Sequence, residues 1–258
     1  MIYSADLVPG TVTLVGGGPG DPGLLTVAGF EAVRQADVIL YDRLAPTAVM
    51  DENPQAERIP VGKVPRGPYV PQERTNELLI EHAKAGRKVV RLKGGDSFVF
   101  GRGGEEWQAC AAAGVPVRII PGVTSCVAGP ELMAVPLTHR HMVQGFTVVS
   151  GHVAPGDTRS ELDWAQIAKT GTTLVILMGV AHIGDIATRL MDGGLAGDTP
   201  VAIIADASLP TQRSLTTTLE KAAEDMAEAE INPPAITVVG DVAGLDLDET
   251  QAHAPSDH

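Results

Sequence analysis

Residues 12–23 read VTLVGGGPGDPG, a short β-branched run that leads directly into a glycine-rich turn, and residues 89–96, VVRLKGGD, repeat this arrangement. A buried parallel strand and its turn into a helix have this pattern. Similar runs alternate with amphipathic stretches along the chain, which predicts an α/β protein with largely parallel strands covered on both faces. We expect strands at residues 12–15, 38–41, 89–92, 117–120, 147–149, 174–177, 201–204 and 236–239, and helices at residues 24–36, 72–85, 104–113, 183–191 and 215–229.

Length and composition limit the class of protein. The chain has 258 residues, 44% of them hydrophobic, which suffices for one large or two modest domains. Its formal net charge of -13 at pH 7 argues against a nucleic-acid partner, because such proteins neutralise phosphates with an excess of basic residues. We expect neither a membrane span nor a leader, since no stretch approaches roughly 18 uninterrupted apolar residues and no basic segment precedes an apolar run at the N-terminus.

The cysteines indicate a reducing compartment. Cys110 and Cys126 are the only two in the chain, so no disulfide framework is implied, and no zinc-ligand cluster is visible in the sequence. We therefore expect a cytoplasmic protein without a bound metal.

Proline and glycine interrupt residues 121–140, which is typical of a junction between domains. We expect an N-terminal α/β domain over residues 11–123 and a C-terminal α/β domain over residues 124–244. Residues 245–258 are acidic and lack periodicity, so they are expected to form a disordered tail.

The first glycine-rich turn matches a dinucleotide-binding pattern through Gly18, Gly20 and Gly23, and Asp42 follows the next strand where a ribose-binding carboxylate would lie. This keeps an NAD-dependent oxidoreductase as an alternative. Asp21 and the proline after it, however, are typical of an N-cap and first helical residue, so a carboxylate occupies the donors that a phosphate would need. A purely structural turn also stays open.

The second turn places Asp96 directly after two glycines and lacks the G-K-[ST] element of a phosphate-binding loop. Glycine also lets a ligand approach the backbone closely. Two such turns at the carboxyl ends of strands favour a ligand that carries amines, hydroxyls or a positive centre.

Taken together, the motifs resemble the tetrapyrrole methylase family. The matching segments lie in one order over residues 12–242: residues 16–21, 41–44, 61–63, 91–106, 121–125, 136–140, 178–179, 211–213 and 234–235. The resemblance implies two α/β domains with the cofactor and substrate cleft between them, in a homodimer. Ser97 and Gly17 depart from the usual proline and alanine of the family, and we expect both to loosen their turns.

The resemblance also implies an activity. It points to S-adenosylmethionine-dependent methylation of the tetrapyrrole uroporphyrinogen III at C-2 and C-7, which gives precorrin-2 for sirohaem or cobalamin biosynthesis. A later precorrin methyltransferase of the same family is the nearest alternative, and a non-catalytic tetrapyrrole carrier is another.

Residue roles follow from the same resemblance. It implies Asp42 as proton acceptor and Lys63 as proton donor, although Asp42 could instead pair with Arg43 and Lys63 could be a solvated loop residue. Without the resemblance, Met178 would be core filling, and the two hydroxyl residues at 124 and 125 would be helix caps. The cofactor contacts implied are Pro19, Gly94, Gly95, Asp96, Val99, Thr124, Ser125, Met178 and Ala207.

The implied substrate carries eight carboxylates, so it requires cations. The candidates include Arg43, Arg140 and Arg213, although each could instead form a surface ion pair. The charge distribution allows this role, because residues 219–258 hold ten acidic residues against one basic residue, whereas residues 40–140 hold 13 basic against 11 acidic.

Overall fold

The computed structural model describes residues 6–62 and 70–247. Contacts between Cα atoms divide the chain into two compact units, Met1–Ser125 and Cys126–His258, called unit 1 and unit 2 below. Lys63 and most of the predicted tail, residues 248–258, lie outside the described residues.

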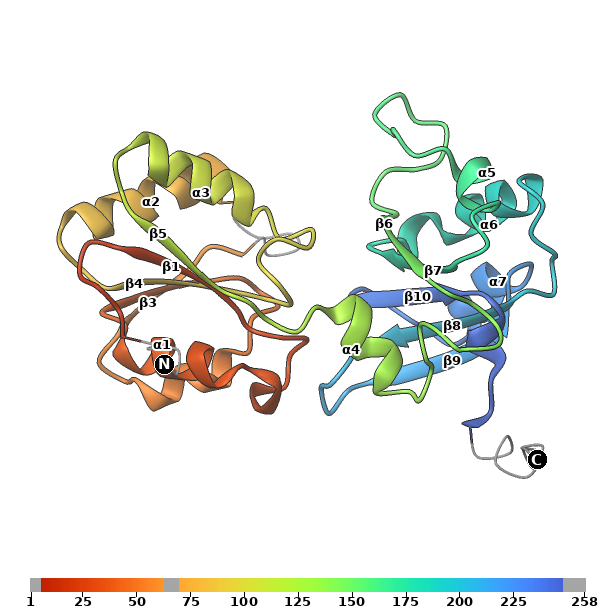
Figure 1. Ribbon diagram of the computed structural model, residues 1–258, viewed down its shortest axis with the longest axis horizontal. Coiled ribbons are helices and arrows are strands. Elements are labelled where there is room, and N and C mark those ends of the chain that lie inside the picture. Colours follow the sequence, from red (N-terminus) through yellow and green to blue (C-terminus); the bar gives the residue numbers. More distant parts are fainter. Residues whose placement is uncertain (1–5, 63–69, 248–258) are drawn as a thin grey trace. The chain divides into compact units, whose positions relative to one another are not determined.

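Unit 1 is built on a parallel five-stranded sheet in the order β3-β2-β4-β1-β5. Helices cover both faces, with α2 and α3 on one and α1 on the other (Figure 1). This confirms the prediction of buried parallel strands. The elements are β1 (Val12–Gly16), α1 (Val27–Gln35), β2 (Val38–Tyr41), β3 (Glu57–Pro60), α2 (Gln72–Lys84), β4 (Val89–Lys93), α3 (Gly103–Ala112) and β5 (Val117–Ile120).

The helix predicted over residues 24–36 divides into two parts. A 3-10 turn, Pro22–Leu24, comes first, and α1 begins only at Val27. Thr26 is the N-cap of α1 and accepts a hydrogen bond from Gly29 N at 3.1 Å. Because this second cap interrupts the apolar pattern, periodicity alone placed the start of the helix too early.

Unit 2 contains a second five-stranded sheet, in the order β6-β7-β10-β8-β9. Here β6 and β7 are parallel, while β10 is antiparallel to β7 and β8, and β9 is antiparallel to β8. The prediction of largely parallel strands is therefore wrong for this unit. Its elements are α4 (Ser125–Glu131, which begins at the boundary), β6 (Phe146–Ser150), α5 (Trp164–Ile167), β7 (Thr173–Leu177), α6 (Ile183–Asp192), β8 (Pro200–Ala205), β9 (Arg213–Thr218), α7 (Ala222–Glu228) and β10 (Ala235–Val239).

The helix predicted over residues 215–229 is also wrong in its first part. Residues 213–218 read RSLTTT and form the edge strand β9, whose hydrogen bonds go to β8. Three consecutive threonines favour a strand because their branched side chains suit a pleated surface. The helix α7 begins at Ala222, once the chain has left the sheet.

Each unit has a core on both faces of its sheet. In unit 1, Val90 and Leu92 pack toward α1, whereas Val89 packs with Leu79 of α2 and Cys110 of α3. Side chains alternate along a strand, so residues 91 and 93 share the face of Val89. No helix in the described ranges is long and apolar enough to cross a membrane.

Candidate active site in unit 1

Three glycine-bearing turns meet at the carboxyl ends of the adjacent strands β4, β1 and β5. Gly18 and Gly95 exchange two backbone hydrogen bonds, of 2.6 and 3.1 Å. A Cβ atom at Gly16 would lie 2.5 Å from the backbone nitrogen of Gly122. The missing side chains therefore allow the turns to contact one another directly.

The space beside the glycines differs from one position to another, and the predicted contacts of Gly94 and Gly95 with a ligand stay predictions. A Cβ at Gly17 would lie 2.5 Å from Pro46 Cδ, and one at Gly94 would lie 2.8 Å from the Leu44 carbonyl oxygen. At Gly17 the absence of a side chain permits close packing against Pro46, and the expected loosening of this turn stays a prediction. Gly95 differs: its φ of +64° favours glycine, and the nearest atom to an added Cβ is 3.7 Å away.

Asp21 closes the first turn as predicted. Its carboxylate accepts a hydrogen bond from Gly23 N at 2.7 Å, and Pro22 is the first residue of the 3-10 turn. Asp21 thus caps the 3-10 turn, whereas the N-terminus of α1 is capped by Thr26.

Asp96 joins the second turn to the segment after β5. One carboxylate oxygen accepts from Phe98 N at 2.8 Å, and the other accepts from Gly122 N at 3.1 Å. Each oxygen retains a further lone pair, so Asp96 can also accept from a ligand. Its contact with a cofactor stays a prediction.

Two other predicted cofactor residues of unit 1, Thr124 and Ser125, lie close to Gly95. The Cβ position of Gly95 is 3.7 Å from Ser125 N and 3.9 Å from Thr124 Cα. Pro19 is partly exposed, and Val99 is 37% exposed. Gly95, Thr124 and Ser125 thus bring backbone groups and two hydroxyl residues close together.

The two predicted cofactor residues of unit 2 follow strands that end at the same edge of their sheet. Leu177 of β7 and Ile204 of β8 both pair with Ile236 of β10, so Met178 and Ala207 leave the sheet on the same side. Met178 is 47% exposed and has a φ of 59°. Core filling, the alternative interpretation of Met178, is therefore wrong.

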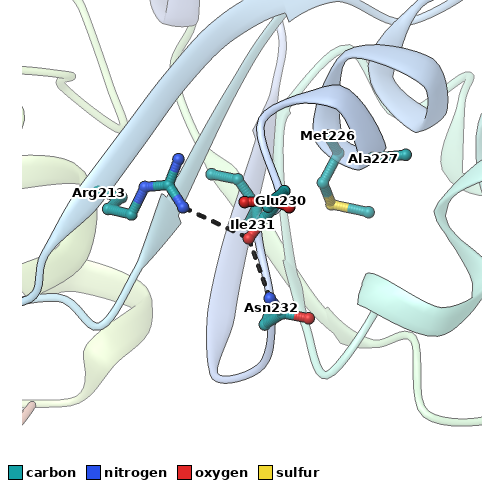
Figure 2. A pocket seen from close by; sticks show the side chains of 6 residues that line it. All are labelled: Arg213, Met226, Ala227, Glu230, Ile231 and Asn232. Atoms are coloured by element: carbon teal, nitrogen blue, oxygen red, sulfur yellow. Dashed lines mark hydrogen bonds between the residues drawn. The ribbon is translucent and has the colours of Figure 1, made fainter.

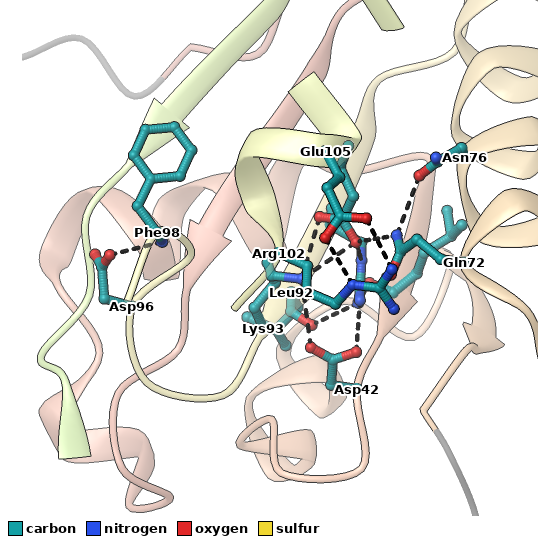
Figure 3. Close-up of polar contacts among 12 residues, drawn as sticks. Asp42, Gln72, Asn76, Leu92, Lys93, Asp96, Phe98, Arg102 and Glu105 are labelled. Carbon is teal, nitrogen blue, oxygen red and sulfur yellow. Dashed lines mark hydrogen bonds and ion pairs between the residues drawn. The ribbon is translucent and has the colours of Figure 1, made fainter. Parts of the chain in front are cut away.

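Asp42 lies at the carboxyl end of β2 and is held by two cations of β4. Its Oδ1 accepts from Arg91 Nη2 at 2.5 Å, and its Oδ2 is 3.7 Å from Lys93 Nζ. Figure 3 shows these contacts converging on the Asp42 carboxylate. Asp42 therefore pairs with Arg91 and Lys93, and the alternative in which it pairs with Arg43 is wrong.

A fully buried carboxylate completes the cluster. Glu106 of α3 accepts from Arg91 Nε at 2.9 Å, and its Oε2 lies 3.1 Å from Lys93 Nζ. Gln72 of α2 donates to the same carboxylate at 3.3 Å. The exposed fractions of the side chains are 0% for Glu106, 4% for Arg91, 3% for Lys93 and 29% for Asp42.

Burial and charge change the two basic groups differently. Burial acts to lower the pKa of Arg91, but the carboxylates of Asp42 and Glu106 outweigh it and raise this pKa. For Lys93, burial and the adjacent Arg91 charge lower the pKa despite the two carboxylates. Arg91 is thus a fixed charge, whereas Lys93 loses its proton more readily than an exposed lysine.

Residues 91–106 belong to a predicted motif, but the roles of Arg91, Lys93 and Glu106 were not predicted from the sequence. The signal that could have found them is the pattern VVRLK, in which two charged residues stand two apart within an apolar strand. Such residues lie on one face, and a buried face must supply them with counter-charges.

The predicted substrate arginines lie apart in the chain. Arg43 and Arg140 are exposed, as is Arg213. Arg213 Nη2 donates to the Ala229 carbonyl at 2.6 Å, at the end of α7, next to an open depression of about 530 Å³ (Figure 2). This arginine therefore has a structural partner, and its contact with a substrate carboxylate stays a prediction.

Among the described residues, no group of three or more His, Cys, Asp and Glu side chains is arranged to hold a metal ion.

Comparisons with known proteins show which family the chain belongs to. Residues 11–223 match the model of the Tetrapyrrole (Corrin/Porphyrin) Methylases. The chain is 46% identical over 237 residues to the S-adenosyl-L-methionine-dependent uroporphyrinogen III methyltransferase of Methanosarcina barkeri, covering 92% of this chain and 93% of that protein. It is 45% identical over 240 residues to the siroheme synthase of Zymomonas mobilis, covering 93% of this chain and 50% of that protein. The chain thus spans about half the length of the siroheme synthases it matches.

A solved structure with the same fold is the uroporphyrin-III C-methyl transferase of Thermus thermophilus complexed with S-adenyl homocysteine. Its TM-score is 0.78 at 40% sequence identity, with 91% of this chain and 99% of that chain covered. The family model and these near full-length matches show that the chain belongs to the tetrapyrrole methylase family.

Proposed function

We propose that this chain is an S-adenosylmethionine-dependent methyltransferase that methylates uroporphyrinogen III twice, at C-2 and C-7, to give precorrin-2. The observation that carries the proposal is the 46% identity, over nearly the full length of both chains, to a relative named for this activity. The geometry of unit 1 fits, because a partly exposed carboxylate lies at the edge of the sheet where α/β proteins bind ligands.

The residues present suit the methyl donor. Gly95, Thr124 and Ser125 lie together and offer backbone groups and hydroxyls to its ribose and amino acid portions. Gly94 and Asp96 would extend this surface, with Pro19 and Val99 beside it. In unit 2, Met178 and Ala207 would contact the donor from the edge that they share. When bound, the donor supplies a sulfonium methyl group that is transferred as an electrophile.

Methyl transfer requires orientation and the removal of a proton. The residues that bind the donor and the substrate would hold a ring carbon in line with the methyl group, whose bonding electron pair would stay on the donor's sulfur. A proton must then leave the alkylated ring system. Asp42 would accept it, and Lys63 would act as proton donor. Holding the reacting atoms in line can itself lower a barrier by roughly 7–11 kcal/mol, so the proton-transfer residues add to a larger effect of positioning.

The substrate carboxylates would meet Arg43, Arg140 and Arg213. Guanidinium groups suit this role because they bind carboxylates through two parallel hydrogen bonds. The overall charge of -13 does not oppose such a substrate, since most of the excess acid lies after residue 218.

We further propose a homodimer in the cytoplasm. The location is supported by Cys110 and Cys126, which are both buried as free thiols, as in proteins of a reducing compartment. The dimer rests on the family resemblance, and sedimentation equilibrium tests it.

The test is incubation with uroporphyrinogen III and methyl-labelled S-adenosylmethionine, followed by mass spectrometry of the product. We expect two labelled methyl groups per tetrapyrrole. A parallel calorimetric titration compares S-adenosylmethionine with NAD, and only the former is expected to bind. Tight NAD binding with no methyl transfer would overturn the proposal.

A further inference from the structure

The cluster of Asp42, Arg91, Lys93 and Glu106, called the charge cluster below, is arranged from the inside outward. Glu106 is fully buried, the two cations lie between the carboxylates, and Asp42 alone has appreciable exposure. A ligand at the edge of the sheet could therefore reach Asp42 but not the other carboxylate. This order suggests that the inner residues act on the outer one.

Glu106 determines where both cations lie. It contacts Arg91 at 2.9 Å and Lys93 at 3.1 Å, and these side chains in turn face Asp42 at 2.5 and 3.7 Å. The guanidinium of Arg91 spans the two carboxylates at once, through Nε on one side and Nη2 on the other. A lysine at position 91 could not reproduce this bridge, because its ammonium is a single point of charge.

The stability of the fold does not explain such a cluster. Removing charges from water costs several kcal/mol per ion, and well-packed apolar residues often serve equally well or better. The cluster is electrically balanced, with two cations and two carboxylates, so none of its charges is left uncompensated. Burying these four charges costs free energy, although the charges balance. Such a cluster is expected where its one accessible carboxylate must be held in a fixed orientation.

We propose that Glu106 is a positioning residue for methyl transfer, which acts through Arg91 and Lys93 to hold the Asp42 carboxylate in its reactive orientation. The inference rests on the proposed function, since it assumes that Asp42 accepts a proton from the substrate. The charged groups that face Asp42 in the described part of the chain are Arg91 and Lys93 from β4, with Glu106 behind them on α3. Glu105 of α3 also acts electrostatically on Lys93.

The experiment compares the wild-type protein with Glu106→Gln in steady-state methyl transfer. We expect kcat to fall by roughly tenfold to a hundredfold, because small misplacements of reacting groups have effects of this size. The KM for S-adenosylmethionine is expected to stay within about twofold.

The matched control is Glu57→Gln, the same substitution on strand β3. Glu57 is 51% exposed and pairs at the surface with Arg87, so its loss is expected to leave kcat unchanged. Arg91→Lys is the second variant, because it preserves net charge and thereby guards against a failure to fold. It should lower kcat without raising KM. Wild-type kcat in a folded Glu106→Gln or Arg91→Lys protein would overturn the inference.

A crystal structure of Glu106→Gln separates this inference from the proposed function. We expect a displaced Asp42 carboxylate and a changed Arg91 side chain, whatever reaction the protein catalyses. If the wild-type protein transfers no methyl group, the proposed function fails, and an unmoved Asp42 in the variant would then reject the positioning role independently.

Discussion

Unit 1 and unit 2 each enclose a five-stranded sheet between two apolar layers, but their central strands differ. In unit 2, the central strands β7, β8 and β10 consist almost entirely of buried valine, isoleucine, leucine, alanine and threonine residues. In unit 1, the central strand β4 buries Arg91 and Lys93 among its apolar residues. Within the described residues, every charged side chain that is buried belongs to unit 1, and the third is Glu106.

This difference distinguishes residues that stabilise the fold from residues that serve the proposed reaction. Unit 2 demonstrates that a sheet of this size closes its core without ions. The ions in unit 1 therefore add a constraint that folding does not require, and they lie at the carboxyl end of the sheet, where the proposed proton acceptor emerges. The following changes test that distinction.

The largest effect is expected from breaking the charge cluster on one side. Arg91→Met leaves Asp42 and Glu106 with Lys93 as their remaining partner in the cluster, so a buried carboxylate loses its main counter-charge. The free energy of unfolding should fall by about 3–5 kcal/mol. Denaturant titration measures it, and a loss below about 1 kcal/mol would mean that the cluster is far more hydrated than the structure indicates.

Replacing the buried ions together should have the opposite consequence for stability. The triple variant Arg91→Met, Lys93→Met, Glu106→Leu gives unit 1 the apolar central strand of unit 2. The protein is expected to stay folded, with stability unchanged or raised by about 1–4 kcal/mol. Methyl transfer, measured in parallel, should be nearly lost, whereas a stable triple variant with full activity would disprove the chemical role of the cluster.

Cys110, which lies close enough to Glu106 to feel its charge, should make the free energy of unfolding depend on pH in the alkaline range. Burial, and then the charge of Glu106, raise the pKa of this thiol from 9.0 to about 11. The folded chain keeps the proton that the unfolded chain loses, so the free energy of unfolding should fall between pH 9 and 11, by up to about 1.4 kcal/mol per pH unit.

Cys110→Ala removes this contribution and should flatten the slope in denaturant titrations between pH 8 and about 11. Cys126→Ala, which changes the buried cysteine of unit 2, retains Cys110 and should keep the slope. An unchanged slope in Cys110→Ala would assign it to other groups.

The smallest effect is expected in the apolar strand of unit 2. Ile203 of β8 is fully buried, and Ile203→Val removes one methylene. The free energy of unfolding should fall by about 0.5–1.5 kcal/mol, with methyl transfer unchanged once the protein is folded. A loss as large as that of Arg91→Met would erase the contrast between the two central strands.

Four of the five strands of unit 1 could be predicted from the sequence, because apolar runs mark them, whereas the mostly exposed edge strand β3 carries no such run and was missed. In unit 2 the strand at residues 236–239 was predicted, but an apolar run carries no signal of strand direction, so the antiparallel direction of β10 was missed. The edge strand β9 has the polar, threonine-rich composition of a surface segment, and its pairing partner β8 determines its structure.

The candidate site divides in the same way. Asp21 was predicted correctly because an N-cap is determined by its own neighbours in sequence. Glu106 was missed because its role depends on two residues of another element, 13 and 15 positions earlier, which only folding brings to it. The direct packing between glycine turns was likewise invisible, since a sequence does not distinguish space for a ligand from space for another backbone.

The most direct test is a double-mutant cycle in single-turnover methyl transfer, with Asp42→Asn, Glu106→Gln and the two combined. The account predicts that Asp42→Asn lowers the rate by about 10²–10⁴. Because Glu106 acts only through Asp42, adding Glu106→Gln to Asp42→Asn should lower the rate no further. If the two effects instead multiply, Glu106 acts independently of Asp42 and the positioning role is contradicted.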